Sequence, residues 1–419
     1  MNDGTRDAGA TGAGATTATA TAGAAAPALP LAGIKVVEFT HMVMGPAVGA
    51  ILAELGADVI KVEPIGGDST RELLGSGAGY FPMYNRNKRS ISLNLKDPRG
   101  LALAKRLCAS ADVVVENFRT GAMDKLGLGY DALAADNPRL IYCSEKGFLA
   151  GPYEHRTALD EVTQMMGGLA YMTGPPGRPL RAGSSVIDVT GGMFGVIGIL
   201  AAIEQRHRTG RGQKVSSALF ETTVYLVGQH MAQKAVTGKA AAPMPARVSA
   251  WAIYDVFETG DGDQLFVGVV SDGLWRTFCE AFALTELGAD PAYRTNSQRV
   301  LARETLLPKV RELFKGYTKA QLVEKLERTG IPFAPIGRPE EMFDDPHLLA
   351  SGGLGDVTLP NGTATKLPIL PIEMGGRRPT RGGKLAKIGE HSAEVLKELG
   401  LSDVELAQLA ADKVVDGAG

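Results

Sequence analysis

The chain has 419 residues, of which 44% are hydrophobic, so it is long enough to bury more than one hydrophobic core. Its 44 lysines and arginines are balanced by 46 aspartates and glutamates. This balance leaves no overall positive field that would attract nucleic acid or an anionic membrane. We therefore expect a soluble globular protein of two domains without a nucleic-acid partner, in which local groups of basic residues bind any anion.

The three cysteines, Cys108, Cys143 and Cys279, are far apart and form no CxxC pair. They indicate neither a disulfide framework nor a zinc site, so we predict no metal and a reducing, cytoplasmic setting. The most apolar stretch, residues 186–203, contains Asp188 and several glycines and alanines. We interpret it as a helix packed inside protein, and we predict no membrane span.

Residues 1–29 are mostly Ala, Thr and Gly and lack the basic and apolar regions of a secretory signal. With almost no large apolar side chains, this segment is expected to be a disordered tail.

Strands then alternate with helices. Residues 34–40 and 58–63 are predicted strands on either side of a helix, with a turn expected at Gly45 and Pro46. A second unit has strands at 90–95 and 112–118, with a helix that starts near Asp97 and Pro98, and another strand starts at Ile141. This alternation predicts an α/β fold with a Rossmann-like parallel sheet, in a large domain over residues 30–236.

The pattern changes after a Gly-, Ala- and Pro-rich linker at 237–249. Two β-rich runs joined by the sequence GDGD at 260–263 predict a hairpin, and amphipathic helices are expected at about 296–317 and 319–328. We assign residues 250–343 to a smaller α/β domain. Residues 344–419, with Gly-rich turns and short strands before two helices, are expected to return to the large domain.

The first βαβ unit does not carry a dinucleotide fingerprint. Gly45 and Gly49 are four residues apart, so GxGxxG is absent, although Glu63 ends the second strand where such folds place a ribose-binding acid. Helix N-termini at the carboxyl ends of parallel strands can still bind a phosphate group without that motif. NAD is therefore excluded, and another phosphate-bearing ligand stays open.

Three short clusters, FTHMVMGP, NKRS and ENF, lie at or just before these strand ends, where open α/β sheets bind ligands. His41 fits a structural role in the turn as well as it fits a ligand contact. Lys88 and Arg89 are adjacent, so on a strand they point to opposite faces, and solvated charge explains them equally well. The same alternative holds for Arg119 and Lys125.

Asp188 starts an otherwise apolar helix of small residues. It could simply be an acid favoured by the helix dipole, a contribution of about 0.3 to 1 kcal/mol. The apolar surroundings would also desolvate the carboxylate and make it more reactive. The residues alone leave both interpretations open.

The segment Arg178–Gln213 resembles the signature of the class III CoA-transferases, the CaiB/BaiF type, with an Arg and a Gly upstream of an Asp and a later AA-E-R-TG-GQ pattern. Other segments resemble that family in family order over nearly the whole folded chain: FTHMVMGP, LGADVIKVEP, NKRSISLNLK, VVENFRTGAMDKLG, TALDEVTQMMGG, GIPFAP and GEHSAEVLKELG. The FTH, NKRS and ENF motifs are similar to those of the formyl-CoA transferase branch.

The resemblance implies that Asp188 is the catalytic aspartate and Asp160 a second acid that orients it. It also implies CoA contacts at His41, Asn117, Phe118 and Lys125, to which we add Lys88 and Arg89 as candidates. The implied assembly is an interlocked homodimer of two ring-like chains. The expected partners are acyl-CoA and small carboxylic acids, with CoA as a cosubstrate and no permanently bound cofactor.

Two departures from the family pattern bear on the substrate. Val43 stands where the oxalate-handling branch has Gln, and we find no glycine-rich flap between Trp251 and Trp275, so formyl and oxalate chemistry is not expected. We expect succinyl-CoA or a similar dicarboxylyl-CoA as the donor, since several branches use it and spare cations are present at Arg156, Arg178, Arg181 and Arg247.

Alternative functions remain. An α-methylacyl-CoA racemase would share the fold and the aspartate, but Leu159 occupies the position of the racemase histidine, and His155 is the nearest substitute. A non-catalytic acyl-CoA-binding subunit is a second alternative, and a lyase or hydratase a third.

Overall fold

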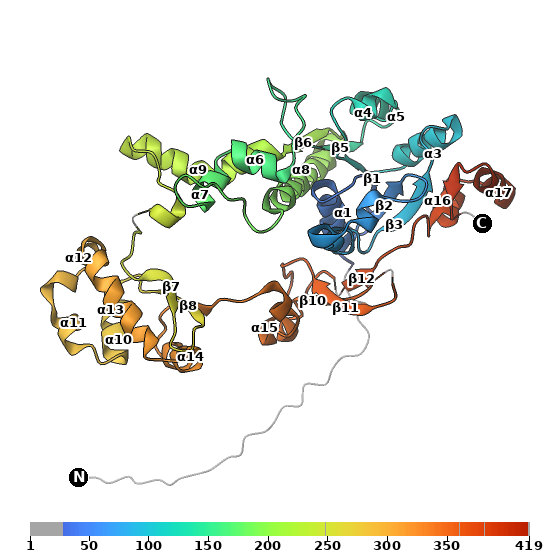
Figure 1. Cartoon of the computed structure of the whole chain (residues 1–419). Helices are drawn as coiled ribbons and strands as arrows, with labels where there is room; N and C mark the ends of the chain where they lie inside the picture. The colour runs from blue at the N-terminus through green and yellow to red at the C-terminus, as the bar shows by residue number, and fades with distance from the viewer. Residues whose placement is uncertain (1–27, 248, 360, 381, 418–419) are drawn as a thin grey trace, which may run out of the picture.

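A computed structural model describes residues 28–247, 249–359, 361–380 and 382–417 (Figure 1). The expected disordered tail at 1–29 therefore lies almost entirely outside the described residues. Two bodies are connected by extended segments, and the chain visits the larger body twice (Figure 1).

The larger body is built on a seven-stranded sheet with the strand order β13-β3-β2-β1-β4-β5-β6. All neighbouring pairs are parallel except β13 with β3. The strands are β1 (Lys35–Phe39), β2 (Asp58–Glu63), β3 (Arg89–Leu93), β4 (Val113–Glu116), β5 (Ile141–Lys146), β6 (Lys214–Ala218) and β13 (Val415–Asp416). The predicted α/β class with a mostly parallel sheet is confirmed. The strand order reverses direction between β1 and β4, which makes the carboxyl ends of these two strands the expected place for a ligand.

Hydrophobic cores cover both faces of this sheet because successive side chains of a strand point to opposite faces. Val36 of β1 belongs to the core under helices α1 (Met44–Glu54) and α8 (Val186–Thr209). Its neighbour Val37 belongs to the core under α3 (Pro98–Ala109), α5 (Tyr130–Asp136), α16 (Ser392–Glu398) and α17 (Asp403–Ala411). The long helix α9 (Leu219–Thr237) follows β6 and leads away from the sheet (Figure 1). The remaining elements of this part are η1 (Ser69–Glu72), η2 (Gly75–Gly79), α2 (Tyr80–Tyr84), α4 (Ala122–Lys125), α6 (Asp160–Met166) and α7 (Leu169–Thr173).

The turn expected at Gly45 and Pro46 is wrong, because helix α1 already begins at Met44. Pro46 lies in the first helical turn, where its missing N–H has no intrahelical acceptor to lose. Gly192 of α8 packs against this turn: a Cβ on it would come within 2.8 Å of the Met44 carbonyl oxygen. The small residues of α8 therefore let the helix approach the start of α1 closely.

The smaller body has its own hydrophobic core, whose members run from Ala252 to Ile331. Its sheet has the order β7-β8-β9, with β7 (Tyr254–Glu258), β8 (Gln264–Gly268) and β9 (Phe333–Pro335), and all pairs are antiparallel. The hairpin predicted around GDGD is confirmed. The helix expected over 296–317 is instead two helices, α12 (Asn296–Leu301) and α13 (Arg303–Lys315). The other elements are η3 (Met244–Ala246), α10 (Asp272–Ala281), α11 (Thr285–Ala289), η4 (Pro291–Tyr293) and α14 (Lys319–Glu327).

The chain then returns to the larger body through η5 (Pro339–Phe343) and α15 (Pro346–Ala350) (Figure 1). A small sheet of order β11-β10-β12 follows, formed by β10 (Leu354–Thr358), β11 (Ala364–Pro368) and β12 (Gly382–Lys384). Beyond α16 and α17, strand β13 pairs with β3 through Val415 and Asp416. Residues more than 300 positions apart in the sequence thus meet at one edge of the large sheet.

Helix α17 ends in a tight turn at Lys413, which has a φ of 56°. The Val414 N–H donates to the Leu409 carbonyl at 2.9 Å, and the Lys413 N–H donates to the Ala410 carbonyl at 3.0 Å. These are the two hydrogen bonds of a Schellman motif, whose left-handed residue is usually glycine. A side chain in that conformation costs about 1 to 2 kcal/mol.

Candidate active site

A cavity of about 1330 Å³ lies along the carboxyl edge of the large sheet. It is lined by the segments that follow strands β1 to β5, by a loop after β5, and by one residue of the C-terminal turn: 39–41, 62–65, 68–69, 93–96, 117–120, Ala122, 145–147, 154–159 and Lys413. The cavity therefore spans the point at which the strand order reverses, the usual ligand position in this type of sheet.

Asn117 joins the two strands at that point. Its side-chain Nδ2 donates to the His41 carbonyl at 2.8 Å, and its Oδ1 accepts from the His41 N–H at 3.0 Å. The rings of His41 and Phe118 stack with their centroids 5.5 Å apart. Burial, opposed by Asp68, lowers the pKa of His41, so its imidazole is neutral near pH 7. The structure thus brings three predicted contact residues together as a flat, uncharged platform in the cavity wall.

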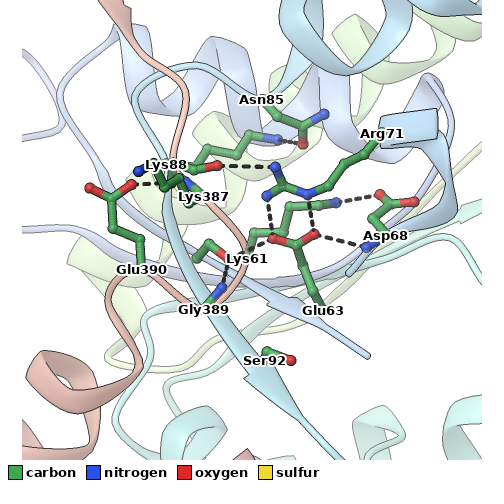
Figure 2. Close-up of polar contacts among 12 residues, drawn as sticks. Lys61, Glu63, Asp68, Arg71, Asn85, Lys88, Ser92, Lys387, Gly389 and Glu390 are labelled. Carbon is green, nitrogen blue, oxygen red and sulfur yellow. Dashed lines mark hydrogen bonds and ion pairs between the residues drawn. The ribbon is translucent and has the colours of Figure 1, made fainter. Parts of the chain in front are cut away.

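A cluster of buried charges lies next to this platform, and Figure 2 shows part of it, with Lys61, Asp68 and Lys88 among the labelled residues. Lys61 donates to the Thr40 carbonyl at 2.7 Å and pairs with Asp68 at 3.0 Å. Lys88 pairs with Glu38 at 2.8 Å and donates to the Pro46 carbonyl at 2.9 Å. These bonds fix the loop after β1 and the first turn of α1.

The Lys88 ammonium is bound within that cluster. Lys88 therefore does not line the cavity, although it was one of the expected CoA contacts. It is 4% exposed, and burial, partly offset by Glu38, lowers its pKa to about 8. The position of Lys88 is explained by its contacts in the buried cluster, and it is not part of the proposed ligand site.

Arg89 is also placed away from the cavity. It starts strand β3, at the opposite edge of the sheet, and its guanidinium pairs with Asp58, Glu394 and Glu398 at 2.5, 3.0 and 2.6 Å. Lys125 is exposed at the end of α4, whose first residue Ala122 lines the cavity, but Lys125 itself does not line it.

Other cations do line the cavity: Lys96, Arg119, Lys146, Arg156 and Lys413. Sequence reasoning named Arg119 and Arg156 but missed the three lysines. Lys146 ends a recognisable strand, so its position at the sheet edge could have been found. Lys413 could not, because its place depends on the pairing of β13 with β3.

Asp160 and Asp188 are brought together at the starts of helices α6 and α8. The Oδ2 of Asp160 accepts from the Ile187 N–H at 2.8 Å and from the Asp188 N–H at 3.1 Å, and its Oδ1 accepts from the Gln164 side chain. The residue before α8, Ser185, makes no side-chain capping bond. A buried carboxylate from another helix therefore caps α8 and fixes the backbone of Asp188.

The Asp188 carboxylate itself is half-buried and, among the residues that the structure describes, accepts no hydrogen bond and has no ion-pair partner. Burial, followed by the negative charges of Asp160 and Glu161, raises its pKa to about 7, against the opposing effect of Arg181. Asp188 does not line the cavity directly, but Leu159, which precedes Asp160, does. This carboxylate has unoccupied oxygens and an elevated basicity, as a nucleophile or a proton acceptor requires.

A third carboxyl group, Glu145, was not predicted as a site residue. It is 2% exposed at the end of β5, where Cys143 Sγ lies 3.1 Å from its Oε1 and its Oε2 has no partner in the described structure. Burial raises its pKa well above the usual range. The carboxyl group fits beneath α8 only because residue 195 is glycine: a Cβ there would lie 2.0 Å from Oε1.

Comparison with known proteins identifies the protein class. The model of CoA-transferase family III matches residues 31–392. The chain belongs to this family. A succinate–glutarate CoA-transferase of Agrobacterium fabrum is 36% identical over 384 residues, covering 88% of this chain and 96% of that protein. A succinyl-CoA:mesaconate CoA-transferase of Haloarcula hispanica is 34% identical, over 88% of this chain and 96% of its own.

The crystal structure of a CaiB/BaiF family protein from Brucella suis has a TM-score of 0.79 to this chain at 35% identity, covering 89% of this chain and all of that one. The family resemblance of the sequence is thus confirmed, and the protein is a CoA-transferase. The cavity and the adjacent pair of aspartates form its candidate active site.

The neutral state of Glu145 has a measurable consequence for stability. An unfolded glutamate ionises near its ordinary pKa, whereas the folded group keeps its proton, so stability falls as pH rises from the unfolded pKa toward the folded one. Glu145→Gln lacks this cost. We expect the free energy of unfolding of the wild type to decrease relative to that of Glu145→Gln as pH rises above the unfolded pKa of glutamate, by up to about 1.4 kcal/mol per pH unit. Urea unfolding at several pH values measures the difference, and parallel curves would contradict a protonated Glu145.

Proposed function

We propose that the enzyme moves CoA from succinyl-CoA or a similar dicarboxylyl-CoA to a small carboxylic acid, with Asp188 as the residue that carries first the acyl group and then CoA. The observation that carries this proposal is the half-buried carboxylate of Asp188, which has a pKa of about 7 and no partner among the described residues, on a backbone that Asp160 fixes beside the cavity. An acid that merely stabilised the helix end would need neither the burial nor the second acid.

The reaction proceeds through alternating anhydrides and thioesters. An Asp188 oxygen attacks the thioester carbon of the donor, the C–S bond breaks, and a mixed anhydride and CoA thiolate form. The thiolate then attacks the Asp188 carbonyl carbon, which releases the free donor acid and leaves CoA on Asp188 as a thioester. The acceptor carboxylate attacks that carbonyl and expels the thiolate again, and the thiolate takes the acceptor acyl group from the second anhydride.

This sequence ends with Asp188 again a free carboxylate and CoA on the acceptor. In each step a carboxylate displaces a thiolate or a thiolate displaces a carboxylate. No proton is consumed, and no resident cofactor is called for. Asp160 acts as a positioning residue, because it holds the backbone N–H of Asp188 and does not need to touch the substrate.

The proposed donor class is supported by the relatives, whose names specify succinate with glutarate and succinyl-CoA with mesaconate. Arg156 lines the same end of the cavity as Leu159 and can offset a second carboxylate. Leu159 supports transfer over racemisation, because a leucine cannot move a proton at the position where a racemase is expected to hold a base. His155, the nearest substitute, also lines the cavity, so the racemase stays the alternative function.

We also propose that two copies form the working enzyme. Helix α8 is long and apolar enough to cross a membrane by length and composition, yet only 44% of its most apolar window is buried. One face packs on α1 and β5, while Met193 and Ile197 on α8 and Tyr225 on α9 are 48%, 58% and 72% exposed. An exposed apolar face of this kind is typical of a protein–protein interface. A second copy of this chain can cover it, because in a two-fold dimer the same face of both copies packs against itself. The passage of the chain out to the smaller body and back (Figure 1) supports the interlocked form of this dimer.

The first prediction concerns the nucleophile. Asp188→Asn should lower transfer from succinyl-CoA by at least about a thousandfold, because the covalent route is lost, while the fold is retained. Hydroxylamine added with the donor should label the wild type on the peptide containing Asp188. Asp131→Asn, which changes another first-turn acid on α5, is the matched control and should keep full activity. Near-normal turnover of the Asp188 variant, or a label on another peptide, would show that Asp188 is not the nucleophile.

The second prediction concerns pH. Only the ionised form of Asp188 attacks, and its pKa is about 7, so kcat/KM for the donor should rise about tenfold per pH unit below that value and level off above it. Initial rates from about pH 5.5 to about pH 8.5 at subsaturating donor give the profile. A flat profile over that range would mean that no group with this pKa controls the attack.

The third prediction concerns assembly. Light scattering should give about 88 kDa, twice the chain mass of 44.0 kDa, and dilution to micromolar protein should not change it. Ile197→Asp places a charge on the apolar face and should reduce the yield of dimer. Leu301→Asp, at an 87% exposed site in the smaller body, should not. A stable monomer of the wild type, with or without binding to lipid vesicles, would contradict the proposed dimer.

A further inference from the structure

Two lysines form one end of the cavity, at the edge of the sheet formed by β3 and β13. Lys96 follows β3, and Lys413 lies in the turn before β13. A hydrogen bond of 2.9 Å from the Asn94 N–H to the Val414 carbonyl holds the two segments together. Both lysines are exposed, line the cavity and have no ion-pair partner in the part of the chain that the structure describes.

The acids nearest to these lysines in the sequence are already engaged. Asp97 and Asp412 both pair with Arg99, at 3.0 and 2.5 Å. Asp416 accepts hydrogen bonds from the Gly66 N–H at 3.1 Å and the Ser92 hydroxyl at 3.2 Å. The two ammonium groups are therefore left to act on whatever occupies the cavity.

Residue 413 is a lysine, although the local backbone conformation favours glycine. The Schellman turn after α17 places this residue in the left-handed region, at a φ of 56°, where glycine is the least strained choice. A lysine there adds nothing to the hydrogen bonds of the turn, which its backbone makes alone. Residue 413, however, lines the cavity.

The two ends of the cavity are far apart. The sheet order places β3 four strand spacings from β5, about 19 Å at about 4.8 Å per spacing. The β5 end leads through Leu159 to Asp160 and Asp188. In CoA the reactive sulfur and the 3′-phosphate of the adenosine lie at opposite ends of an elongated molecule. A CoA with its thioester at Asp188 and its length along the cavity has its adenosine end near β3.

We propose that Lys413, together with Lys96, binds the 3′-phosphate of CoA. This phosphate is a monoester and carries a charge of about −1.5 to −2 near pH 7, so it is the strongest single anion on the ligand. A lysine ammonium is suited to it as a point charge that does not impose a fixed hydrogen-bonding geometry. The C-terminal segment thus supplies a specificity-determining residue that selects CoA over ligands lacking this phosphate.

The proposal rests on the proposed function, because it takes acyl-CoA as the substrate. The test uses two donors, succinyl-CoA and succinyl-3′-dephospho-CoA, with the wild-type enzyme and Lys413→Gly. The variant should raise KM for succinyl-CoA about three- to tenfold with kcat unchanged, and it should leave KM for the dephospho donor unaltered. Its melting temperature should equal or exceed that of the wild type, since glycine relieves the left-handed conformation. Lys413→Arg should preserve most of the discrimination, and Lys397→Ala, which removes an exposed lysine on α16, should preserve all of it.

Calorimetric binding of CoA and 3′-dephospho-CoA separates this proposal from the proposed function, because it requires no turnover. A preference for CoA that Lys413→Gly abolishes supports the phosphate site even if another acyl group is the true donor. Equal weakening of both ligands by Lys413→Gly, or no weakening of either, would overturn the assignment of Lys413 to the 3′-phosphate.

Discussion

The two hydrogen bonds that the Asp160 carboxylate accepts from the first turn of α8 hold the part of the molecule on which the candidate chemistry depends. A helix start normally attracts negative charge, and here that position is filled by a carboxylate from a different helix. The consequence for Asp188 is electrostatic as well as geometric. Burial of its own carboxylate, and then the negative charge of Asp160 beside it, raise the pKa of Asp188, so its proton is held more tightly than that of an ordinary aspartate. The contact with Asp160 therefore fixes the backbone that carries the Asp188 side chain and adds to the effect of burial on its basicity.

The buried charges below the cavity serve a different purpose. Lys61 and Lys88 are fully committed to Glu38, Asp68 and backbone carbonyls, and they hold the loop after β1 in place. Burying such ions is costly unless their partners are well placed, and removing a single partner from such a pair typically costs about 3 to 5 kcal/mol. The cluster is thus a rigid support for His41 and Asn117, and it leaves the cavity wall itself nearly uncharged at the point where the strand order reverses.

How far the sequence predicts this arrangement depends on how local the determining contacts are. Strand and helix alternation predicts the parallel sheet, and the residues at the strand ends include His41, Asn117 and Phe118, which do meet in the cavity wall. For Lys88 and Arg89, adjacency correctly implied opposite faces. Lys88 pairs with Glu38, 50 residues away, and Arg89 pairs with Asp58, 31 residues away, and with Glu398, 309 residues away, so pattern reasoning could not show that neither lines the cavity. Asp188 was ambiguous from its surroundings alone. The family resemblance, and not the residue pattern, favoured it and paired it with Asp160.

The return of the chain to the larger body has a consequence for the order of events during synthesis. Residues 252–331, which share one hydrophobic core, leave the ribosome before strand β13 exists, so the smaller body can fold while the larger sheet still has an unpaired edge at β3. The turn at Lys413 and strand β13 can reach the cavity only after the smaller body has been synthesised. A nascent chain therefore has no complete adenosine end to its cavity until residues 413–416 have emerged from the ribosome.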